Sequence, residues 1–469
     1  MAETNPTSSV NSPKPLSRAL KTFFGVGDMT FTFMTNLESY YFMFFLTDIA
    51  KFAPALIASI TSIASMVDMA LSWVYGGILS GLKARKWGRY RSYLIMIPWI
   101  VPFLYAFQYM KIGNNDNVAA IIIIAGSITS HILWNTAYVA NVTLISVVGK
   151  TPEDKAIMSS NRGAAQSLSG ILFSYIGLPL TTVLGGVVGQ ANRFAAGAFC
   201  LAAAFAIGYF IHFKMTEGYE DSESSEAAAA AAVKNKVSVP DMFRALFQNS
   251  QLLILIVAYT VWCIYQFVFA GTAVYYWRIV AGDVNLNNTF ILFTSIGSII
   301  GAISARQVVK MLSARTTMLI GCFLSGIFLS AIAFVYTSPM VVMTVSVIGR
   351  FFTGFSNATF VVLFSDTIIY ATWKTGKNAA GWIMGLMNLP VKVAVFLRGL
   401  IITGALAAIG YSAKLTPAQF TPQLKQGLAM TFGLIPGISL LVSGLIILLA
   451  FKLTKAKVAQ YQAEIDNRA

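Results

Sequence analysis

Residues 62–92, SIASMVDMALSWVYGGILSGLKARKWGRYRS, show what kind of protein this chain forms. A long apolar run holds a single carboxylate, Asp68, near its middle and then ends in a cluster of lysines and arginines. A helix needs about 20 apolar residues to cross a bilayer, so the run predicts a membrane-spanning helix followed by a basic loop. A carboxylate at that depth is costly unless it is paired, protonated or hydrated. Asp68 is therefore expected to have a partner or a function.

The composition of the whole chain is typical of a membrane protein. Of its 469 residues, 57% are hydrophobic and 11% are charged, whereas soluble domains carry about 25% charged residues. The formal net charge of +15 could indicate a nucleic-acid partner, but the cations gather in short segments between apolar runs. Such segments are typical of cytoplasmic loops beside membrane lipid. We therefore expect an all-α membrane protein with lipid around it and no nucleic-acid partner.

The cysteines and histidines do not form a metal-binding or catalytic pattern. Cys200, Cys263 and Cys322 each lie inside an apolar run, which is typical of small buried side chains rather than of a disulfide or metal set. The two histidines, His131 and His212, are far apart in the sequence. A membrane-embedded enzyme would need a nucleophile, a base or metal ligands in one constellation. We expect no cofactor, no metal and no enzymatic activity.

Cutting the apolar runs at glycine, proline and charge clusters predicts twelve transmembrane helices. They are expected near residues 25–48, 54–81, 91–110, 118–148, 161–188, 194–214, 251–280, 287–310, 316–336, 341–369, 379–407 and 429–453.

The loops between these spans alternate in charge. Basic loops occur at 83–91, 150–155, 306–315 and 374–377, and loops poor in lysine and arginine occur at 113–117 and 282–288. All the basic loops fall on one side of the membrane if both termini are cytoplasmic, which is the arrangement that the positive-inside rule favours. The polar N-terminus lacks the short apolar core and cleavage site of a signal peptide, so we expect a retained tail.

The spans divide into two groups of six. The expected parts are a cytoplasmic tail (1–23), a six-helix bundle (24–215), a cytoplasmic linker (216–250), a second six-helix bundle (251–455) and a cytoplasmic tail (456–469). The linker begins with an acidic, Ser-rich and Ala-rich segment and then reads VPDMFRALF, which predicts a short amphipathic helix on the inner membrane face. Two six-helix bundles are typical of secondary transporters that bind substrate near the membrane midplane, between the halves.

Isolated charges deep in the spans are the candidates for ion coupling. Lys392, in MNLPVKVAVFLRG of the eleventh span, is expected at a depth similar to that of Asp68, so the two are natural partners across a central cavity. The alternative is a purely structural ion pair between helices. Ser72 follows Asp68 by one helical turn. Glu38 in the first span and Arg350 in the tenth could each be part of a structural pair or a proton carrier.

The fourth span carries a polar face that suits a sugar. In SHILWNTAYVANV, His131, Asn135 and Tyr138 fall on one side of a helix, with Trp134 adjacent. Amides bond sugar hydroxyls and aromatic faces stack on sugar C–H surfaces. The alternative is a polar contact between helices.

Six short motifs in register resemble one transporter family over essentially the whole chain. They are FGVGD (24–28), FFLTD (44–48), Asp68 with RKWGRYR (85–91), GKTPEDKAIMSSNR (149–162), the stretch from Asp366 to YATWKTGKNAAG (370–381), and Lys392. In order and spacing they are similar to the glycoside–pentoside–hexuronide:cation symporters of the melibiose permease type. The resemblance implies the major facilitator fold, with two six-helix bundles and transport by symport.

The resemblance also assigns candidate site residues. Three of the family's four sodium ligands fall on Leu71, Ser72 and Ile132, which leaves only Asp68 as a carboxylate, so coupling to protons is expected in place of sodium. The implied substrate positions are Thr32, Asn135, Arg162 and Lys392, and the family's aromatic position falls on Val139, with Tyr138 beside it. To these we add Trp134 and Asn388, the latter in the MNLPVK segment. Because the family's acidic sugar ligands fall on Thr32 and Asn135, an acidic or otherwise different ligand is expected in place of a galactoside. The premise is that the cations Arg162 and Lys392 lack acidic competitors.

We therefore expect a monomeric transporter of the bacterial inner membrane that imports a glycoside, pentoside or hexuronide with protons by alternating access. Two alternatives stay open within transport. One is an uncoupled facilitator, and the other is a symporter for a small organic solute that is not a sugar. A channel is disfavoured because the buried charges are divided between two halves instead of lining one continuous pore.

Overall fold

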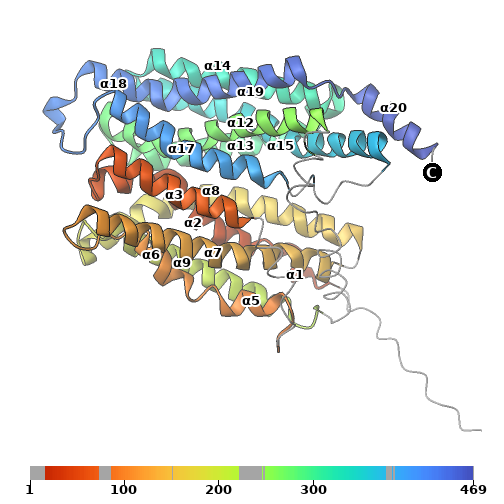
Figure 1. Cartoon of the computed structure of the whole chain (residues 1–469), viewed down its shortest axis with the longest axis horizontal. Coiled ribbons are helices and arrows are strands. Elements are labelled where there is room, and N and C mark those ends of the chain that lie inside the picture. The colour runs from red at the N-terminus through yellow and green to blue at the C-terminus, as the bar shows by residue number, and fades with distance from the viewer. Residues whose placement is uncertain are drawn as a thin grey trace, which may run out of the picture.

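The computed structural model describes residues 16–72, 86–149, 151–220, 246, 249–376, 383 and 386–467. Within these ranges the chain folds into long helices arranged as two bundles, one from each half of the sequence (Figure 1). The predicted amphipathic helix of the linker lies outside the described residues, apart from Leu246, and the loop residues 83–85 lie outside them as well.

The N-terminal half contains a short helix and then the first six expected spans. Its elements are α1 (Arg18–Phe23), α2 (Val26–Phe44) continued by a π-helical turn η1 (Phe45–Ile49), α3 (Pro54–Ser72), α5 (Arg91–Met96), α6 (Val101–Phe107), α7 (Asp116–Val148), α8 (Pro152–Val188) and α9 (Arg193–Met215).

The C-terminal half contains the other six expected spans and a final helix. Its elements are α12 (Ser250–Tyr275) with η2 (Tyr276–Val280), α13 (Leu286–Met311), α14 (Ala314–Val335), α15 (Pro339–Thr375), α17 (Asn388–Ala408), the short η3 (Pro417–Gln419), α18 (Pro422–Ala429) with η4 (Met430–Leu434) and α19 (Ile435–Ala450), and α20 (Lys455–Asp466).

Ten helices among the described residues are long and apolar enough to cross a membrane. The two remaining expected spans are also helical, but each has a feature that weakens its apolar character. The first, α2 with η1, carries Asp28, Glu38 and Asp48. The third is divided into α5 and α6 around Pro98, because proline cannot donate the backbone hydrogen bond that a continuous helix requires. The twelve expected spans thus each correspond to helical structure.

Local sequence signals fix where several helices begin and end. The Asn115 side chain accepts hydrogen bonds from the backbone N–H groups of Asn117 and Val118 at 2.9 and 3.3 Å, which caps the start of α7. Thr151 caps α8 in the same way through the N–H of Asp154 at 3.1 Å. Gly376 ends α15 with φ of +69°, a left-handed conformation that glycine adopts without a steric penalty.

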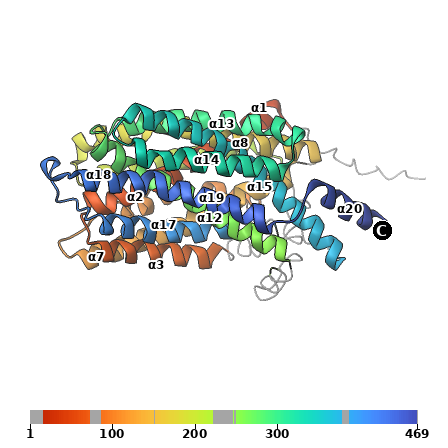
Figure 2. The ribbon, with the colours of Figure 1, turned by 90° about the horizontal axis from the view of Figure 1, so that it is seen from above.

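Among the described residues, three helix pairs make the most extensive contacts between the two halves. Helix α2 packs on α12, α3 packs on α17, and α8 packs on α13, and Figures 1 and 2 show the last two pairs side by side. The helices α8 and α13 approach closely, since a Cβ on Gly170 would lie 2.8 Å from Ser295 Oγ and the serine side chain would have to rotate away. Helices α1 and α20 lie towards the same end of the molecule (Figure 1).

Candidate functional site

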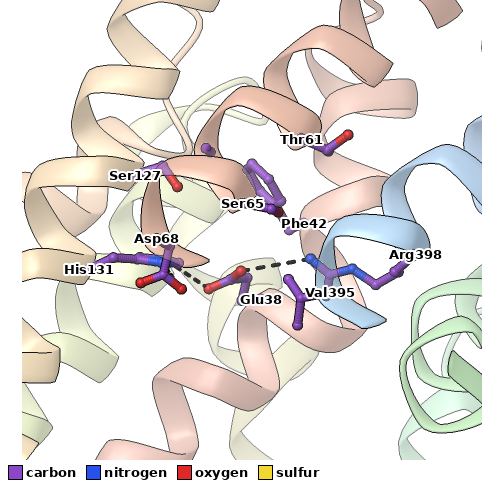
Figure 3. Close-up of a pocket in the computed structure, with 10 residues that line it drawn as sticks. Glu38, Phe42, Thr61, Ser65, Asp68, Ser127, His131, Val395 and Arg398 are labelled. Carbon is purple, nitrogen blue, oxygen red and sulfur yellow. Dashed lines mark hydrogen bonds and ion pairs between the residues drawn. The ribbon is translucent and has the colours of Figure 1, made fainter. Parts of the chain in front are cut away.

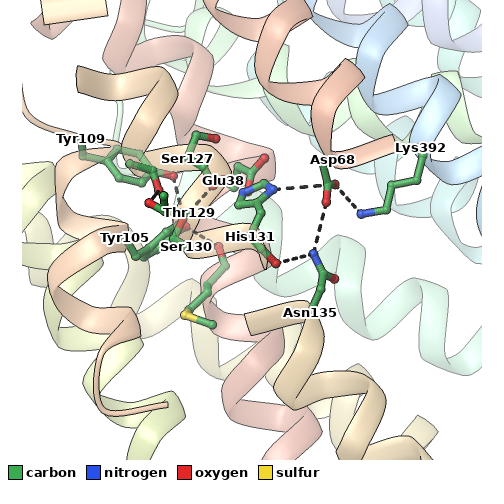
Figure 4. A network of polar contacts seen from close by, with 12 residues as sticks. Glu38, Asp68, Tyr105, Tyr109, Ser127, Thr129, Ser130, His131, Asn135 and Lys392 are labelled. Atoms are coloured by element: carbon green, nitrogen blue, oxygen red, sulfur yellow. Dashed lines mark hydrogen bonds and ion pairs between the residues drawn. The ribbon is translucent and has the colours of Figure 1, made fainter. Parts of the chain in front are cut away.

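Asp68 and Lys392 meet across the interface between the halves. Lys392 of α17 donates a hydrogen bond to Asp68 Oδ2 of α3, as Figure 4 shows. The Asp68 side chain is 8% exposed and that of Lys392 is 21% exposed. The charge cost of a buried carboxylate is thus offset by a cation from the other half. The structure agrees with the pairing that the two isolated charges predicted.

His131 of α7 connects Asp68 to a second carboxylate, that of Glu38. The imidazole Nε2 lies 3.1 Å from Glu38 Oε2, and Nδ1 lies 3.7 Å from Asp68 Oδ2. On its other side, Glu38 faces Arg398 of α17, with 3.7 Å between Oε1 and the nearest guanidinium nitrogen (Figure 3). The result is a line of side chains, Arg398–Glu38–His131–Asp68–Lys392, in which each carboxylate lies between two nitrogen groups. The line runs from one C-half cation through the N-half to another C-half cation.

A small cavity lies within this network. It measures about 20 Å³, which is enough for roughly one water molecule. Figure 3 shows the polar side chains of Glu38, Asp68, His131 and Arg398 around it. The lining residues are Glu38, Phe42, Thr61, Ala64, Ser65, Asp68, Ser127, His131, Val395 and Arg398. The cavity is too small for a sugar, so in this conformation it suits water or a proton carrier.

Asn135 and Trp134 occupy different positions relative to the network. The Asn135 amide donates to Asp68 Oδ1 at 3.3 Å and to the His131 carbonyl at 2.8 Å (Figure 4). Trp134 is 3% exposed, and its ring stacks on His131 with 4.5 Å between centroids. Asn135 therefore faces the polar interior, whereas Trp134 packs behind His131 in the N-half.

The premise about Arg162 is wrong. Arg162 of α8 donates to both oxygens of Asp28 in α2, from Nε at 2.7 Å and from Nη2 at 2.5 Å. Asp28 is fully buried, and Gln166 and Asn141 also donate to it. Arg162 thus neutralises an acid of its own half, because a buried carboxylate needs a partner. Lys392 likewise has an acidic competitor in Asp68.

The remaining candidates lie around these residues. The Tyr138 hydroxyl is 3.4 Å from Arg162 Nη2, and its ring stacks on Phe31 with 4.5 Å between centroids. The Thr32 hydroxyl donates to the Asp28 carbonyl at 2.7 Å. Asn388 is exposed at the first turn of α17. Ser72 is the last residue of α3, and its side chain lies outside the described residues.

A second polar cluster joins the halves at the end of the molecule opposite α1 and α20 (Figure 1). Arg278 of η2 donates to Asp48 of η1, and the Tyr411 hydroxyl donates to the same carboxylate at 2.6 Å. The hydroxyls of Thr47 and Tyr275 are 2.6 Å apart. Next to these contacts is a hollow of about 420 Å³ lined by both halves.

Sequence reasoning missed three of these participants, and the chain carried a signal for one of them. Arg398 is a second isolated cation in the same span as Lys392, six residues further on, so intramembrane charge alone marks it as a candidate. Asp48 and Arg278 lie near span ends, where charged residues are common, and only the folded structure shows that they meet.

Comparisons with known proteins also indicate a membrane transporter. The model of the family described as "MFS/sugar transport protein" matches residues 23–455. The chain belongs to this family. The match confirms the resemblance in the sequence motifs, and it makes the protein a transporter rather than an enzyme.

The curated relatives of this family member are distant in sequence. The isoprimeverose transporter of Lactiplantibacillus pentosus is 23% identical and is aligned over 83% of this chain and 80% of its own length. A putative sulfoquinovose importer of Escherichia coli is also 23% identical, over 96% of this chain and 93% of its own.

The solved structures support the fold. A D-xylose-proton symporter superposes with a TM-score of 0.65 at 12% identity, covering 93% of this chain and 98% of its own. A bacterial homologue of the lysosomal transporter Spinster, in an inward-facing and unoccupied conformation, gives a TM-score of 0.60 at 11% identity, covering 96% of this chain and 98% of its own. The major facilitator fold expected from the sequence is therefore confirmed.

Proposed function

We propose that this transporter imports a sugar-type solute together with protons by alternating access. The observation that carries the proposal is the bridge that His131 forms between Glu38 and Asp68. The imidazole hydrogen-bonds to Glu38 at 3.1 Å and lies within ion-pair distance of Asp68 at 3.7 Å. The three groups therefore form a chain along which a proton can move once the imidazole shifts towards Asp68. The cavity beside them has room for about one water molecule, which can carry a proton into the network.

The surroundings of Asp68 favour a proton over sodium. A hard cation binds several oxygen ligands at once. Asp68 is instead approached by nitrogen groups, from Lys392, Asn135 and His131. An added sodium ion would meet these donors and their positive charge, whereas a proton needs only one free carboxylate oxygen. This agrees with the sequence-based expectation that the family's sodium ligands are replaced at Leu71 and Ile132.

The ion pairs between the halves link protonation to movement. Lys392 and Arg398 belong to the C-half, and their carboxylates belong to the N-half. When the halves move apart, each pair opens and leaves a carboxylate without its cation. Protonation removes that charge and lowers the cost of opening. The proton therefore accompanies the conformational change, which is the requirement for coupled uptake.

The membrane orientation follows from the loop charges. The end that carries α1, α20 and the basic loops faces the cytoplasm of a bacterial cell under the positive-inside rule. The Asp48–Arg278–Tyr411 cluster then closes the outer end, and the described conformation is closed to the outside. The substrate path lies between the two halves of one chain, so a single chain contains a complete path and the protein acts as a monomer.

The test is uptake into proteoliposomes that contain the purified transporter. A panel of radiolabelled glycosides, pentosides and hexuronides is offered under an inward pH gradient, an inward sodium gradient or neither. We expect accumulation with the pH gradient that collapses with a protonophore, and little response to sodium. Strong sodium stimulation at fixed pH overturns proton coupling. Uptake that equilibrates under every condition favours an uncoupled facilitator, and the absence of uptake of any sugar favours a different organic solute.

A further inference from the structure

Arg350 differs from the other cations within the helices. Arg162, Arg278, Lys392 and Arg398 each contact a carboxylate. Arg350 of α15 donates to the Tyr265 hydroxyl of α12, and among the described residues no carboxylate lies within ion-pair distance of it. Tyr265 lies on α12, which packs on α2 of the other half, and Tyr40 of α2 is the phenol on that side whose charge state Arg350 influences electrostatically. Neutral phenols hydrogen-bond to a guanidinium, but they do not cancel its charge.

Arg350 lies deep in its helix, so the lack of a described carboxylate beside its positive charge has an energetic cost. Arg350 is 11 residues into α15, which corresponds to about 16 Å at helical rise, and so lies well inside the hydrocarbon layer. A cation at that depth is costly unless it is paired or hydrated. The Arg350 side chain is partly exposed. Each of its guanidinium nitrogens either is accessible or has a hydrogen-bond partner. Part of the Arg350 side chain is therefore accessible and not enclosed by the protein.

The position of Arg350 is that of a binding site rather than of a support within one bundle. Arg350 and Tyr265 come from the C-half, and Tyr40 comes from α2 of the N-half. Glu38 is two residues before Tyr40, so their side chains leave α2 about 200° apart. A ligand at Arg350 would thus lie on a different side of α2 from the Glu38–His131–Asp68 network. Substrate and proton can occupy the protein together, as symport requires.

We propose that Arg350, with the Tyr265 and Tyr40 hydroxyls, binds the oxyanion of an acidic sugar, either a carboxylate or a sulfonate. This inference rests on the proposed function and narrows it to anionic substrates. A guanidinium binds such groups with two parallel N–H···O hydrogen bonds, and phenol hydroxyls supply further donors. The acidic substrate expected from the sequence is retained, but Arg350 replaces Arg162 and Lys392 as its ligand.

The experiment compares three sugars that differ at one position. Methyl β-D-glucuronide has a carboxylate at C6. Methyl sulfoquinovoside has a sulfonate on C6, and methyl β-D-glucoside has a hydroxyl on C6. Binding to the purified protein is measured by the thermal stability shift and by competition in uptake. We expect at least one anionic sugar to bind at least about tenfold more tightly than the glucoside. Arg350→Gln should remove that preference, and Arg350→Lys should restore part of it.

Two controls separate binding from folding. Arg306 is exposed near the end of α13, so Arg306→Gln removes an equal charge outside the site and should leave the preference intact. Without ligand, Arg350→Gln should unfold at or above the wild-type temperature, because it removes an uncompensated charge. A large drop in that temperature would assign Arg350 a structural role and overturn the inference.

The remaining outcomes separate this inference from the proposed function. Proton-driven uptake of sugars without any preference for the anion overturns the anion site and keeps the symporter. A preference for the anion that survives Arg350→Gln also overturns it. An Arg350-dependent preference without any response to a pH gradient supports the anion site and overturns proton coupling instead.

Discussion

The two halves of the transporter share an architecture but differ in the charge that they present to each other. The N-half supplies the carboxylates Glu38, Asp48 and Asp68, and the C-half supplies their cations. By contrast, the Arg162–Asp28 pair lies entirely within the N-half. Pairs between the halves must open when the halves separate, whereas a pair within one half can persist. We therefore expect ion pairs between the halves to serve transport, and the ion pair within the N-half to stabilise the fold.

The largest expected effect on transport comes from the pair at the centre of the interface. Asp68→Asn and Lys392→Gln should each abolish accumulation, since a buried charge left without its partner costs about 3–5 kcal/mol. The double variant should recover expression better than it recovers transport, because it restores neutrality but removes the proton-binding group. Uptake and membrane yield are measured for all three. Normal accumulation by both single variants would show that the pair has no functional role.

The pair within the N-half should give the larger loss of stability. Asp28 is fully buried, whereas Asp68 adjoins a cavity. Arg162→Gln should therefore lower the melting temperature of the purified protein more than Lys392→Gln does, because the Asp28 charge cannot reach water. Arg315→Gln, at an arginine that donates to helix-end carbonyls of α19, is the matched control. If Arg162→Gln and Lys392→Gln had equal melting temperatures, the ion pair within the N-half would not stabilise the fold more than the pair between the halves.

His131 should affect coupling more than exchange. Its imidazole lies between two carboxylates, so His131→Gln keeps a polar side chain but removes the group that exchanges a proton between them. We expect pH-driven accumulation to fall at least about tenfold, with exchange of substrate across the membrane without a gradient largely kept. Both rates are measured in the same proteoliposomes. Parallel losses of accumulation and exchange would indicate a structural role.

The cluster at the outer end should set how often the halves open there. Tyr411→Phe removes a hydrogen bond to Asp48, and a hydrogen bond to a charged group contributes about 1.5–3 kcal/mol. A cysteine at Ile57, which lines the adjoining hollow, should then react about tenfold faster or more with a membrane-impermeant reagent. Tyr336→Phe is the control, because the Tyr336 ring lies outside that cluster and its carbonyl accepts from Tyr276. An unchanged rate would show that Asp48 does not hold this end closed.

The smallest effect is expected at the surface of the end that carries α1. A hydrogen bond from Lys21 lowers the pKa of Asp154. Asp154 thus stabilises the fold at pH values above its ordinary pKa of about 3.9, and this contribution disappears as the pH falls through the lowered pKa. Because Lys21 is 38% exposed, solvent screening keeps the effect below about 1 kcal/mol. Lys21→Gln should remove this part of the acid sensitivity of the melting temperature, and Lys21→Arg should preserve it.

Much of the fold could be read from the sequence because membrane insertion depends on local composition. Apolar runs and basic loops marked each helical region, and proline and acidic residues account for the two that are less apolar. The candidate site was read only in part. Asp68 and Lys392 were identified as a pair because isolated charges in apolar spans are costly wherever the helices pack. Trp134 was placed on a ligand face, but the helix turns its ring towards the N-half interior.

The sequence by itself thus determined the spans, the division into two halves and which side chains needed a charged partner. Only the tertiary structure decided which partner each one found. Arg162 met Asp28, Arg398 met Glu38, and Arg350 met the Tyr265 phenol and, within the described part of the chain, no carboxylate. The physical reason is that the cost of burying a charge depends on one residue and its span, whereas its compensation depends on how helices distant in sequence are packed and rotated against each other.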